Sequence, residues 1–288
     1  MKIHAVSTAA SLAVIGIALS GCGGDSGGGG GSGGGAAKDA VCKLPKTGGS
    51  VKVGIKYDQP GMGLKVGDKY TGFDVDMATC VAAKMGFSKI DFIESPSSQR
   101  EKMLQAGTVQ MTLATYTINE KRKKVVSFAG PFFVAGQSLM VAKDSTVTGV
   151  KDLAGKKVCS VTGSNSVDGL KAKAPALVPQ KYDTYSACAE ALASGSIDAV
   201  TTDDTILAGY ANQAQYKDKF KLVGGTFTVE NYGVGIKKGD TALCKKINTA
   251  IAKTIADGEW KKAVANNLGS YYKLNEKLNP PKQRPCAA

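Results

Sequence analysis

Histidine is almost missing from this 288-residue sequence, which contains a single one, His4. His4 lies in an N-terminal segment that we expect to be removed, so the remaining chain should contain no histidine. Its absence excludes nucleophilic sites of the Ser-His-Asp and Cys-His types, and it excludes metal sites that depend on histidine. We expect no metal or other cofactor.

The sequence also lacks an apolar run long enough for a transmembrane helix, because its N-terminal apolar run is too short to span a bilayer. Lys2 and an apolar run over residues 5–19 precede Leu-Ser-Gly-Cys, which ends at Cys22. We predict that residues 1–21 form a signal peptide. Leu-Ser-Gly-Cys resembles the lipobox of bacterial lipoproteins, in which the cysteine thiol is diacylated. This implies a palmitate-type anchor at Cys22 on the extracytoplasmic face of the cell membrane; the alternative is an ordinary secretory signal with an incidental cysteine.

Glycine is concentrated after Cys22, where ten glycines lie between positions 23 and 35. Such a segment cannot pack a core, so we expect residues 22–40 to be a flexible tether. The net charge of +13 comes from scattered lysines, and aromatic residues make up only 7% of the chain. We interpret this charge as a surface that faces an anionic membrane or cell wall, and we expect no nucleic-acid partner.

Cysteine is present in an even number once Cys22 is set aside. In an exported protein, six further cysteines predict three disulfides. No pair has CxxC spacing, so a zinc cluster or redox motif is a poor alternative. Fifteen connectivities are possible. We expect the first two pairs below because each joins a predicted strand region to a nearby helix. The full set is Cys42–Cys80, Cys159–Cys188 and Cys244–Cys286.

Short β-branched runs alternate with helical patterns from about residue 50, which predicts an α/β fold with largely parallel sheets. The first series runs to about residue 124, and a second series follows from residue 157 to 211. Extended segments at 138–142 and 232–236 would join the two blocks as a paired hinge. We predict one lobe from residues 41–140 and 236–288 and a second from 141–235, with a ligand site in the cleft between them.

Arg122 stands out because it falls in the first turn of a predicted helix that follows a strand. The run at 111–114 is typical of a buried strand end, and Thr117 to Glu120 fits the S/T-x-x-E capping box that opens a helix. Free N–H groups at a helix start favour an anion, and a guanidinium adds two charge-assisted hydrogen bonds. This predicts a carboxylate site. The alternative is a surface ion pair.

Five motifs in order resemble the polar amino-acid-binding proteins of bacterial ABC importers, family 3, and most closely the lipid-anchored glutamate-binding branch of actinobacteria. They are TGFDVDMA (71–78), LATYTINEKRKKVVSFAGPFF (113–133), GVKDLAGKKVCSVTGSNS (149–166), IDAVTTDD (197–204) and YGVGIKKGD (232–240). The resemblance covers about residues 50–269. It implies the type 2 periplasmic binding protein fold, a two-lobed clamp whose lobes are joined by a two-strand hinge.

The resemblance also implies which residues hold the two ends of an amino acid. Arg122 would grip the α-carboxylate, with hydroxyl and backbone donors from the turn that contains Ser164 and Asn165. Asp203 would meet the α-ammonium, because a buried charge needs such a partner. Further contacts would come from Thr117 and from the backbone at Ala114 and Thr115. The alternative for Asp203 is a helix N-cap, a role that Asp204 could also take.

By the same resemblance, Lys56 and Arg100 face the ligand side chain, with Ser97 and Tyr185 as hydrogen-bond donors. Two cations there favour an anion, because a neutral amide would leave them uncompensated at a cost of several kcal/mol. Glutamate is therefore the preferred ligand, followed by aspartate. The alternatives are a solvent-facing lysine at position 56 and a helix-surface charge at position 100.

These expectations describe a monomeric protein that captures L-glutamate and delivers it to an ABC transporter permease driven by a separate ATPase. Glutamine or another polar amino acid is the alternative ligand. A tethered sensor would use the same clamp, and the sequence does not separate sensing from transport. Some relatives dehydrate cyclic carboxylates, but that chemistry needs a general acid or base, and Asp203 is better explained as an ammonium partner. The resemblance therefore implies that the protein is not an enzyme.

Overall fold

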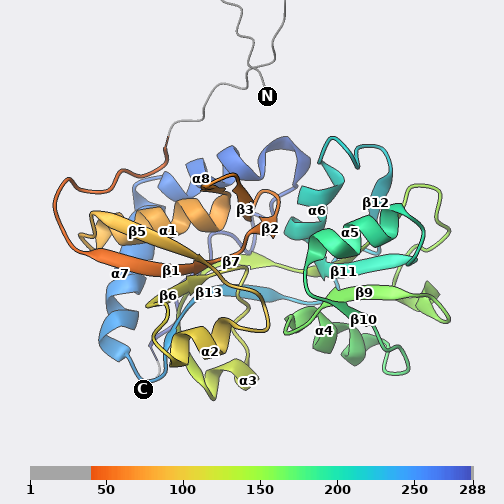
Figure 1. Cartoon of the computed structure of the whole chain (residues 1–288), viewed down its shortest axis with the longest axis horizontal. Helices are drawn as coiled ribbons and strands as arrows, with labels where there is room; N and C mark the ends of the chain where they lie inside the picture. The colour runs from red at the N-terminus through yellow and green to blue at the C-terminus, as the bar shows by residue number, and fades with distance from the viewer. Residues whose placement is uncertain (1–39, 287–288) are drawn as a thin grey trace, which may run out of the picture. The chain divides into compact units, whose positions relative to one another are not determined.

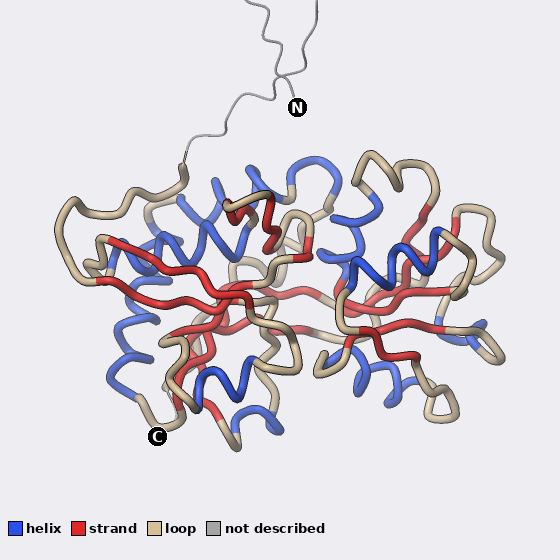
Figure 2. The backbone as a smooth tube through the Cα atoms, viewed as in Figure 1, coloured by secondary structure: helices blue, strands red, loops and turns tan. Residues whose placement is uncertain are grey.

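The structure is a computed structural model that describes residues 40–286. The expected signal peptide (1–21), the lipidation site Cys22 and nearly all of the tether lie outside the described residues. No helix between residues 40 and 286 has the length and apolarity needed to cross a membrane. The described chain contains two five-stranded sheets, one smaller sheet and eight α-helices (Figures 1 and 2).

The first large sheet has the strand order β5-β1-β6-β13-β7. β1 pairs in parallel with β5 and β6, whereas β13 runs antiparallel to β6 and β7. The strands are β1 (Ser50–Ile55), β5 (Lys89–Glu94), β6 (Met111–Leu113), β7 (Val126–Ala135) and β13 (Glu230–Lys237). The sequence did not predict β7, because Gly130-Pro131 interrupts its pattern. A proline is tolerated there because β7 is the edge strand of this sheet.

The second large sheet has the order β10-β9-β11-β8-β12. β9 pairs in parallel with β10 and β11, and β8 runs antiparallel to β11 and β12. The strands are β8 (Gln137–Ala142), β9 (Val158–Val161), β10 (Gln180–Tyr182), β11 (Ala199–Asp203) and β12 (Phe220–Val223). Two mainly parallel strand groups, each extended by an antiparallel strand, confirm the type 2 binding-protein architecture with two α/β lobes.

Helices pack on both faces of each sheet, as expected for βα units. Around the first sheet, α1, α7 and α8 contact one another on one side, and α2 and α3 contact β7 on the other (Figure 1). Around the second sheet, α5 and α6 lie opposite α4. The bounds are α1 (Phe73–Lys84), α2 (Arg100–Gln105), α3 (Glu120–Lys123), α4 (Asn165–Lys173), α5 (Tyr185–Ala193), α6 (Asp204–Ala211), α7 (Thr241–Ala256) and α8 (Glu259–Asn267), with 3-10 turns at Val150–Leu153 and Gly269–Tyr271.

A small three-stranded sheet connects the lobes. It consists of β2 (Asp58–Gln59), β3 (Gly63–Val66) and β4 (Lys69–Thr71). β3 and β4 contact α1 of the first lobe, whereas β2 contacts α5 and α6 of the second. The segment that follows β1 therefore reaches across to the opposite lobe, which the sequence did not predict.

The chain passes between the large sheets at two places that touch each other. Sheet membership changes at Gly136 and again between Val223 and Glu230. A Cβ at position 136 would lie 2.5 Å from Cβ of Thr226, so the two passing segments need glycine there. The lobe boundaries expected at 140 and 235 remain a prediction. The chain changes from one large sheet to the other at Gly136 and again between Val223 and Glu230, a few residues before each expected boundary.

The structure confirms the three expected disulfides. Cys42–Cys80 fastens the start of the described chain to α1, and Cys159–Cys188 joins β9 to α5. Cys244–Cys286 ties α7 to the C-terminal segment. Each bridge therefore lies within one lobe, and none of the three joins the lobes to each other.

Candidate functional site

A small cavity lies between the two lobes. It is lined by nine of the eleven predicted ligand contacts, namely Ser97, Arg100, Thr115, Thr117, Arg122, Ser164, Asn165, Tyr185 and Asp203. Two predicted residues, Lys56 and Ala114, are not among those that line it. Four lining residues were not predicted: Gln59, Ser166, Thr202 and Ile206.

Arg122 is buried and points into this cavity, with 5% of its surface exposed. Its Nη1 donates to the carbonyl of Thr117 at 2.7 Å, and its Nε lies 3.2 Å from Oε1 of Glu101. Nη2 donates across the cleft to the carbonyl of Gly163 at 3.1 Å. The guanidinium is thus held in one orientation by groups from both lobes, and a surface ion pair does not describe it.

The predicted capping box at Thr117 is wrong. α3 begins at Glu120, and its N-cap is Asn119, whose Oδ1 accepts from the backbone N–H of Arg122 at 2.8 Å. Thr117 instead forms an isolated antiparallel bridge with Tyr232. Asparagine is as good an N-cap as threonine, and the extended conformation of Thr117 removes it from the helix. Because α3 is a single turn, its dipole is weak, and any attraction for an anion must come mainly from the guanidinium of Arg122.

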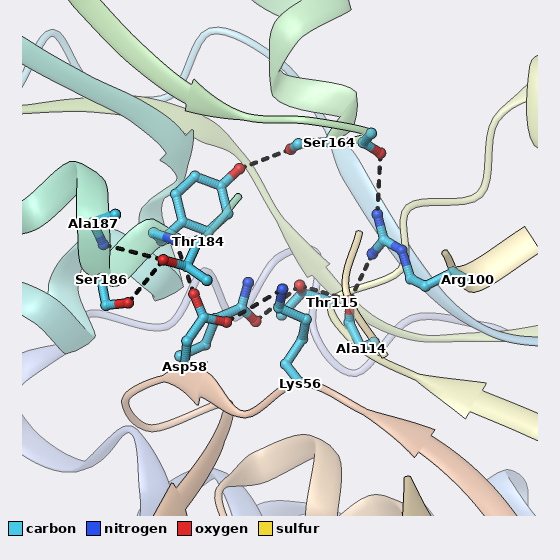
Figure 3. A network of polar contacts seen from close by, with 12 residues as sticks. Lys56, Asp58, Arg100, Ala114, Thr115, Ser164, Thr184, Ser186 and Ala187 are labelled. Atoms are coloured by element: carbon cyan, nitrogen blue, oxygen red, sulfur yellow. Dashed lines mark hydrogen bonds and ion pairs between the residues drawn. The ribbon is translucent and has the colours of Figure 1, made fainter. Parts of the chain in front are cut away.

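Arg100 is the first residue of α2 and is 2% exposed. Nη1 donates to the carbonyl of Ala114 at 2.8 Å, and Nη2 to that of Gly163 at 3.3 Å (Figure 3). Its Nε has no hydrogen-bond partner, and no carboxylate of residues 40–286 forms an ion pair with it. Burial, and secondarily the charge of Arg122, lowers the pKa of Arg100 to about 10. A cation buried without an ion pair favours an incoming anion.

The aromatic ring of Tyr116 lies beside both arginines. The Cζ atoms of Arg100 and Arg122 are 4.5 Å and 4.8 Å from its centroid. Cation–π contacts of this kind offset part of the cost of burying the two like charges. The sequence placed Tyr116 between Thr115 and Thr117 but gave no sign of this contact, because the guanidinium groups come from two other elements.

Thr115 adopts an unusual backbone conformation at the floor of the cavity, with a positive φ of 45°. Its N–H donates to Oδ2 of the fully buried Asp74 at 2.7 Å, and its hydroxyl donates to Oε1 of Gln59 at 3.1 Å. The preceding carbonyl, that of Ala114, accepts from Arg100 (Figure 3). One peptide unit therefore lies between a buried carboxyl group and a buried guanidinium, and both orient it.

The second lobe supplies hydroxyl and amide groups from the turn before α4. Ser164 is the N-cap of α4, and its Oγ accepts from the hydroxyl of Tyr185 at 2.7 Å. Asn165 accepts from Nδ2 of Asn119 at 2.8 Å and donates to Glu230 at 2.8 Å. The Asn119–Asn165 contact bridges the lobes beside Arg122. Glu230 was not predicted; its only signal was its place just before the expected hinge strand.

Asp203 ends β11 at the cavity, 5% exposed. Its Oδ2 accepts from the hydroxyl of Tyr232 at 2.6 Å. Burial, and then the nearby charge of Glu230, raises the pKa of Asp203 well above its ordinary value. Asp203 occupies the N-cap position of α6 without a side-chain cap bond, whereas Asp204 accepts from the N–H groups of Gly136 and Thr205. The carboxyl of Asp203 is thus available to a cationic group.

Lys56 is fully buried but already has a partner. Its Nζ lies 3.2 Å from Oδ1 of Asp58, which is itself buried. Burial lowers the pKa of Lys56, and the charge of Asp58 opposes that change. The sequence missed Asp58 and Gln59. They follow the carboxyl end of β1, the place where ligands meet parallel sheets, and that position was the available signal.

The pKa of Asp74 predicts a pH dependence of stability. Burial raises this pKa to about 7. Between about pH 4 and pH 7 the folded state therefore holds a proton that the unfolded chain releases. The resulting stabilisation is fully present at low pH and is lost as the pH rises to 7. Relative to Asp74→Asn, the wild-type free energy of unfolding should fall by on the order of 4 kcal/mol from pH 4 to pH 8.

Urea denaturation at several pH values measures this difference. Asp152→Asn is the matched control, because hydrogen bonds from Thr148 lower the pKa of this exposed carboxylate. The contribution of Asp152 to stability therefore changes at lower pH than that of Asp74. The difference in unfolding free energy between wild type and Asp152→Asn should stay nearly constant from pH 4 to 8. If the free energy of unfolding changed with pH in the same way for wild type and Asp74→Asn, the raised pKa of Asp74 would be contradicted.

Comparison with known proteins agrees with this arrangement. Residues 51–270 match the model of the bacterial extracellular solute-binding proteins, family 3. The chain is 41% identical to the glutamate-binding protein GluB of Corynebacterium glutamicum, over 93% of this chain and 90% of that protein. It is 37% identical to the ABC transporter glutamine-binding protein GlnH of Bacillus subtilis, over 90% and 94%.

A solved structure, an ancestral arginine-binding protein bound to glutamine, superposes with a TM-score of 0.72 at 35% identity, covering 78% of this chain and all of that one. These relatives are named as binding proteins, which supports the prediction that the chain is not an enzyme. The chain belongs to the family 3 bacterial extracellular solute-binding proteins.

Proposed function

We propose that the protein captures glutamate between its lobes, with aspartate as the next-best ligand. The observation that carries this proposal is the guanidinium of Arg100, which is buried at the cavity and hydrogen-bonds only to carbonyl oxygens, with no ion pair among the described residues. A side-chain carboxylate would supply the missing counter-charge. The 41% identity to a glutamate-binding protein supports the same ligand.

The two ends of the amino acid would be held from opposite lobes. Arg122, oriented by Thr117 and Glu101, is the proposed partner of the α-carboxylate. Asp203 is the proposed partner of the α-ammonium, because a cation beside this buried carboxyl would favour its ionised form. Ser97, Thr115, Thr117, Ser164, Asn165 and Tyr185 would complete the contacts. A ligand bound by both lobes at once stabilises the closed form.

Glutamine is the second candidate, and Gln59 is the observation that favours it. Gln59 lines the cavity, and its Oε1 accepts from Thr115. Its amide N–H groups would donate to the carbonyl oxygen of a ligand side-chain amide. The pairing of Lys56 with Asp58 also leaves one side-chain cation where the sequence suggested two. The 37% identity to a glutamine-binding protein agrees with this alternative.

Capture would serve import across the membrane. We propose that Cys22 carries a lipid anchor, that the glycine-rich segment is a leash, and that the monomeric binding protein works at the extracytoplasmic face. It would deliver its ligand to the permease of an ABC importer driven by a separate ATPase. Family membership supports a solute-binding role, and the Leu-Ser-Gly-Cys motif supports the anchor.

Isothermal titration tests the ligand. We expect glutamate to bind with a Kd below about 100 μM and more tightly than aspartate, glutamine, arginine or cystine. The reason is that only an acidic side chain compensates Arg100. Failure to bind glutamate in that range, with tighter binding of glutamine, would replace the main proposal with the second candidate.

Arg100→Met tests the side-chain contact. It should weaken glutamate binding by roughly 2 to 4 kcal/mol more than glutamine binding, because a buried ion pair is lost only for glutamate. Arg122→Met is the matched control. It removes the proposed α-carboxylate partner and should abolish binding of every α-amino acid. Equal losses for glutamate and glutamine in Arg100→Met would show that Arg100 is structural.

Uptake of labelled glutamate tests delivery. Deleting the gene should abolish high-affinity uptake, and the full chain should restore it. Cys22→Ala should restore it poorly, because without a lipid the protein would diffuse away from the permease. Unchanged uptake together with altered amino-acid signalling in the deletion strain would favour the tethered sensor.

A further inference from the structure

Asp58 joins the two lobes through two of its own atoms, and a third atom holds it to Lys56 in its own lobe. It lies in β2 and is 7% exposed. Oδ2 accepts from the backbone N–H of Tyr185 at 2.8 Å, and the backbone carbonyl accepts from the hydroxyl of Tyr210. Oδ1 pairs with Lys56 at 3.2 Å. Asp58 therefore contacts Tyr185, the first residue of α5, and the side chain of Tyr210 in α6.

The contact with α5 satisfies a helix end. The first N–H groups of a helix have no partner within it. Thr184 caps α5 by accepting from the N–H of Ala187 at 3.2 Å, and Asp58 accepts from the N–H of Tyr185 (Figure 3). A carboxylate is favoured at this end of the helix dipole. Opening the lobes would remove this acceptor, so the bond stabilises the closed form alone.

The same bond reaches the ligand cavity. The backbone of Tyr185 is fixed by Asp58, while its hydroxyl donates to Ser164 and its ring lines the cavity. Lys56 keeps Asp58 in place from the other side and supplies the counter-charge that a buried carboxylate requires. Lys56 thereby acts through Asp58 and does not itself line the cavity.

The surroundings of Asp58 leave little room for another arrangement. A Cβ at position 209, next to Tyr210 on α6, would lie 2.1 Å from the carbonyl oxygen of Pro60. Glycine at 209 is therefore what allows α6 to approach the segment that contains Asp58. A close steric fit and three polar contacts occur together at one place between the lobes.

We propose that Asp58, held by Lys56, is a positioning residue that latches the closed clamp and so raises affinity for every ligand without choosing among them. The inference needs only the amino-acid binding that the family shows, and it holds whichever amino acid the protein prefers. It gives Lys56 a different role from the ligand contact that the sequence suggested.

Asp58→Ala in the full chain tests the latch by titration with glutamate, aspartate and glutamine. Every amino acid that the wild type binds should weaken by one common factor, on the order of tenfold or more, because a hydrogen bond to a charged group is lost in the closed form. The loss should appear as faster dissociation. Asp58→Asn, which keeps an acceptor for Tyr185, should recover part of the affinity. Asp91→Ala, at an exposed ion pair with Lys89 in the same lobe, is the control and should bind like wild type.

Gly209→Ala provides a second route if Asp58→Ala does not fold. Alanine is a better helix former than glycine, so α6 should be retained while the added Cβ obstructs closure. An equal loss of affinity for every bound amino acid in Gly209→Ala supports the latch. Selective loss of glutamate in Asp58→Ala or Lys56→Met would assign the pair to side-chain recognition and overturn the proposal. Unchanged affinity in Asp58→Ala, or in Gly209→Ala where the former fails to fold, would also overturn it. A wild type that binds glutamine and not glutamate would refute the proposed ligand and leave this test intact.

Discussion

One carbonyl oxygen, that of Gly163, accepts hydrogen bonds from both arginines of the cavity. Gly163 belongs to the second lobe and the arginines to the first, so this oxygen fixes how the lobes meet. The approach is possible because position 163 has a φ of 78° and no side chain; a Cβ there would lie 2.7 Å from Cα of Ser98. Two like charges buried at one point repel each other, so they need compensating contacts from carbonyl oxygens, a carboxylate and the ring of Tyr116.

Those contacts differ between the two arginines, and the difference separates their proposed roles. Arg122 has Glu101 as a counter-charge, so it can meet any amino acid without depending on the ligand side chain for neutrality. Arg100 has carbonyl oxygens and, through one peptide unit, the buried Asp74. Lys56 has Asp58. In the proposed function, general amino-acid binding and recognition of the ligand side chain thus belong to separate groups that meet at a single carbonyl.

Local chemistry made part of this predictable. Most of the helices and buried strands, the place of Arg122 at the cavity and the three disulfides were predicted from short-range patterns or from motifs that occur in register, whereas strands such as β2 and β7 were not. The partners of buried charges did not follow from the sequence, because Asp58 meets Tyr185 and Arg122 meets Gly163 across the cleft. The cap of α3 was misassigned for a related reason. Thr117 and Asn119 both fit an N-cap, and the bridge between Thr117 and Tyr232 decides between them.

The contact between Gly136 and Thr226 has a mechanical consequence. Because the two passing segments touch there, and each disulfide stays within one lobe, the lobes are joined covalently, between residues 40 and 286, through two adjacent stretches of backbone alone. Any opening of the clamp must therefore bend the chain in these two stretches. Contacts at different points of the cleft, such as Arg122 with Gly163 and Asp58 with Tyr185, would then oppose the same opening.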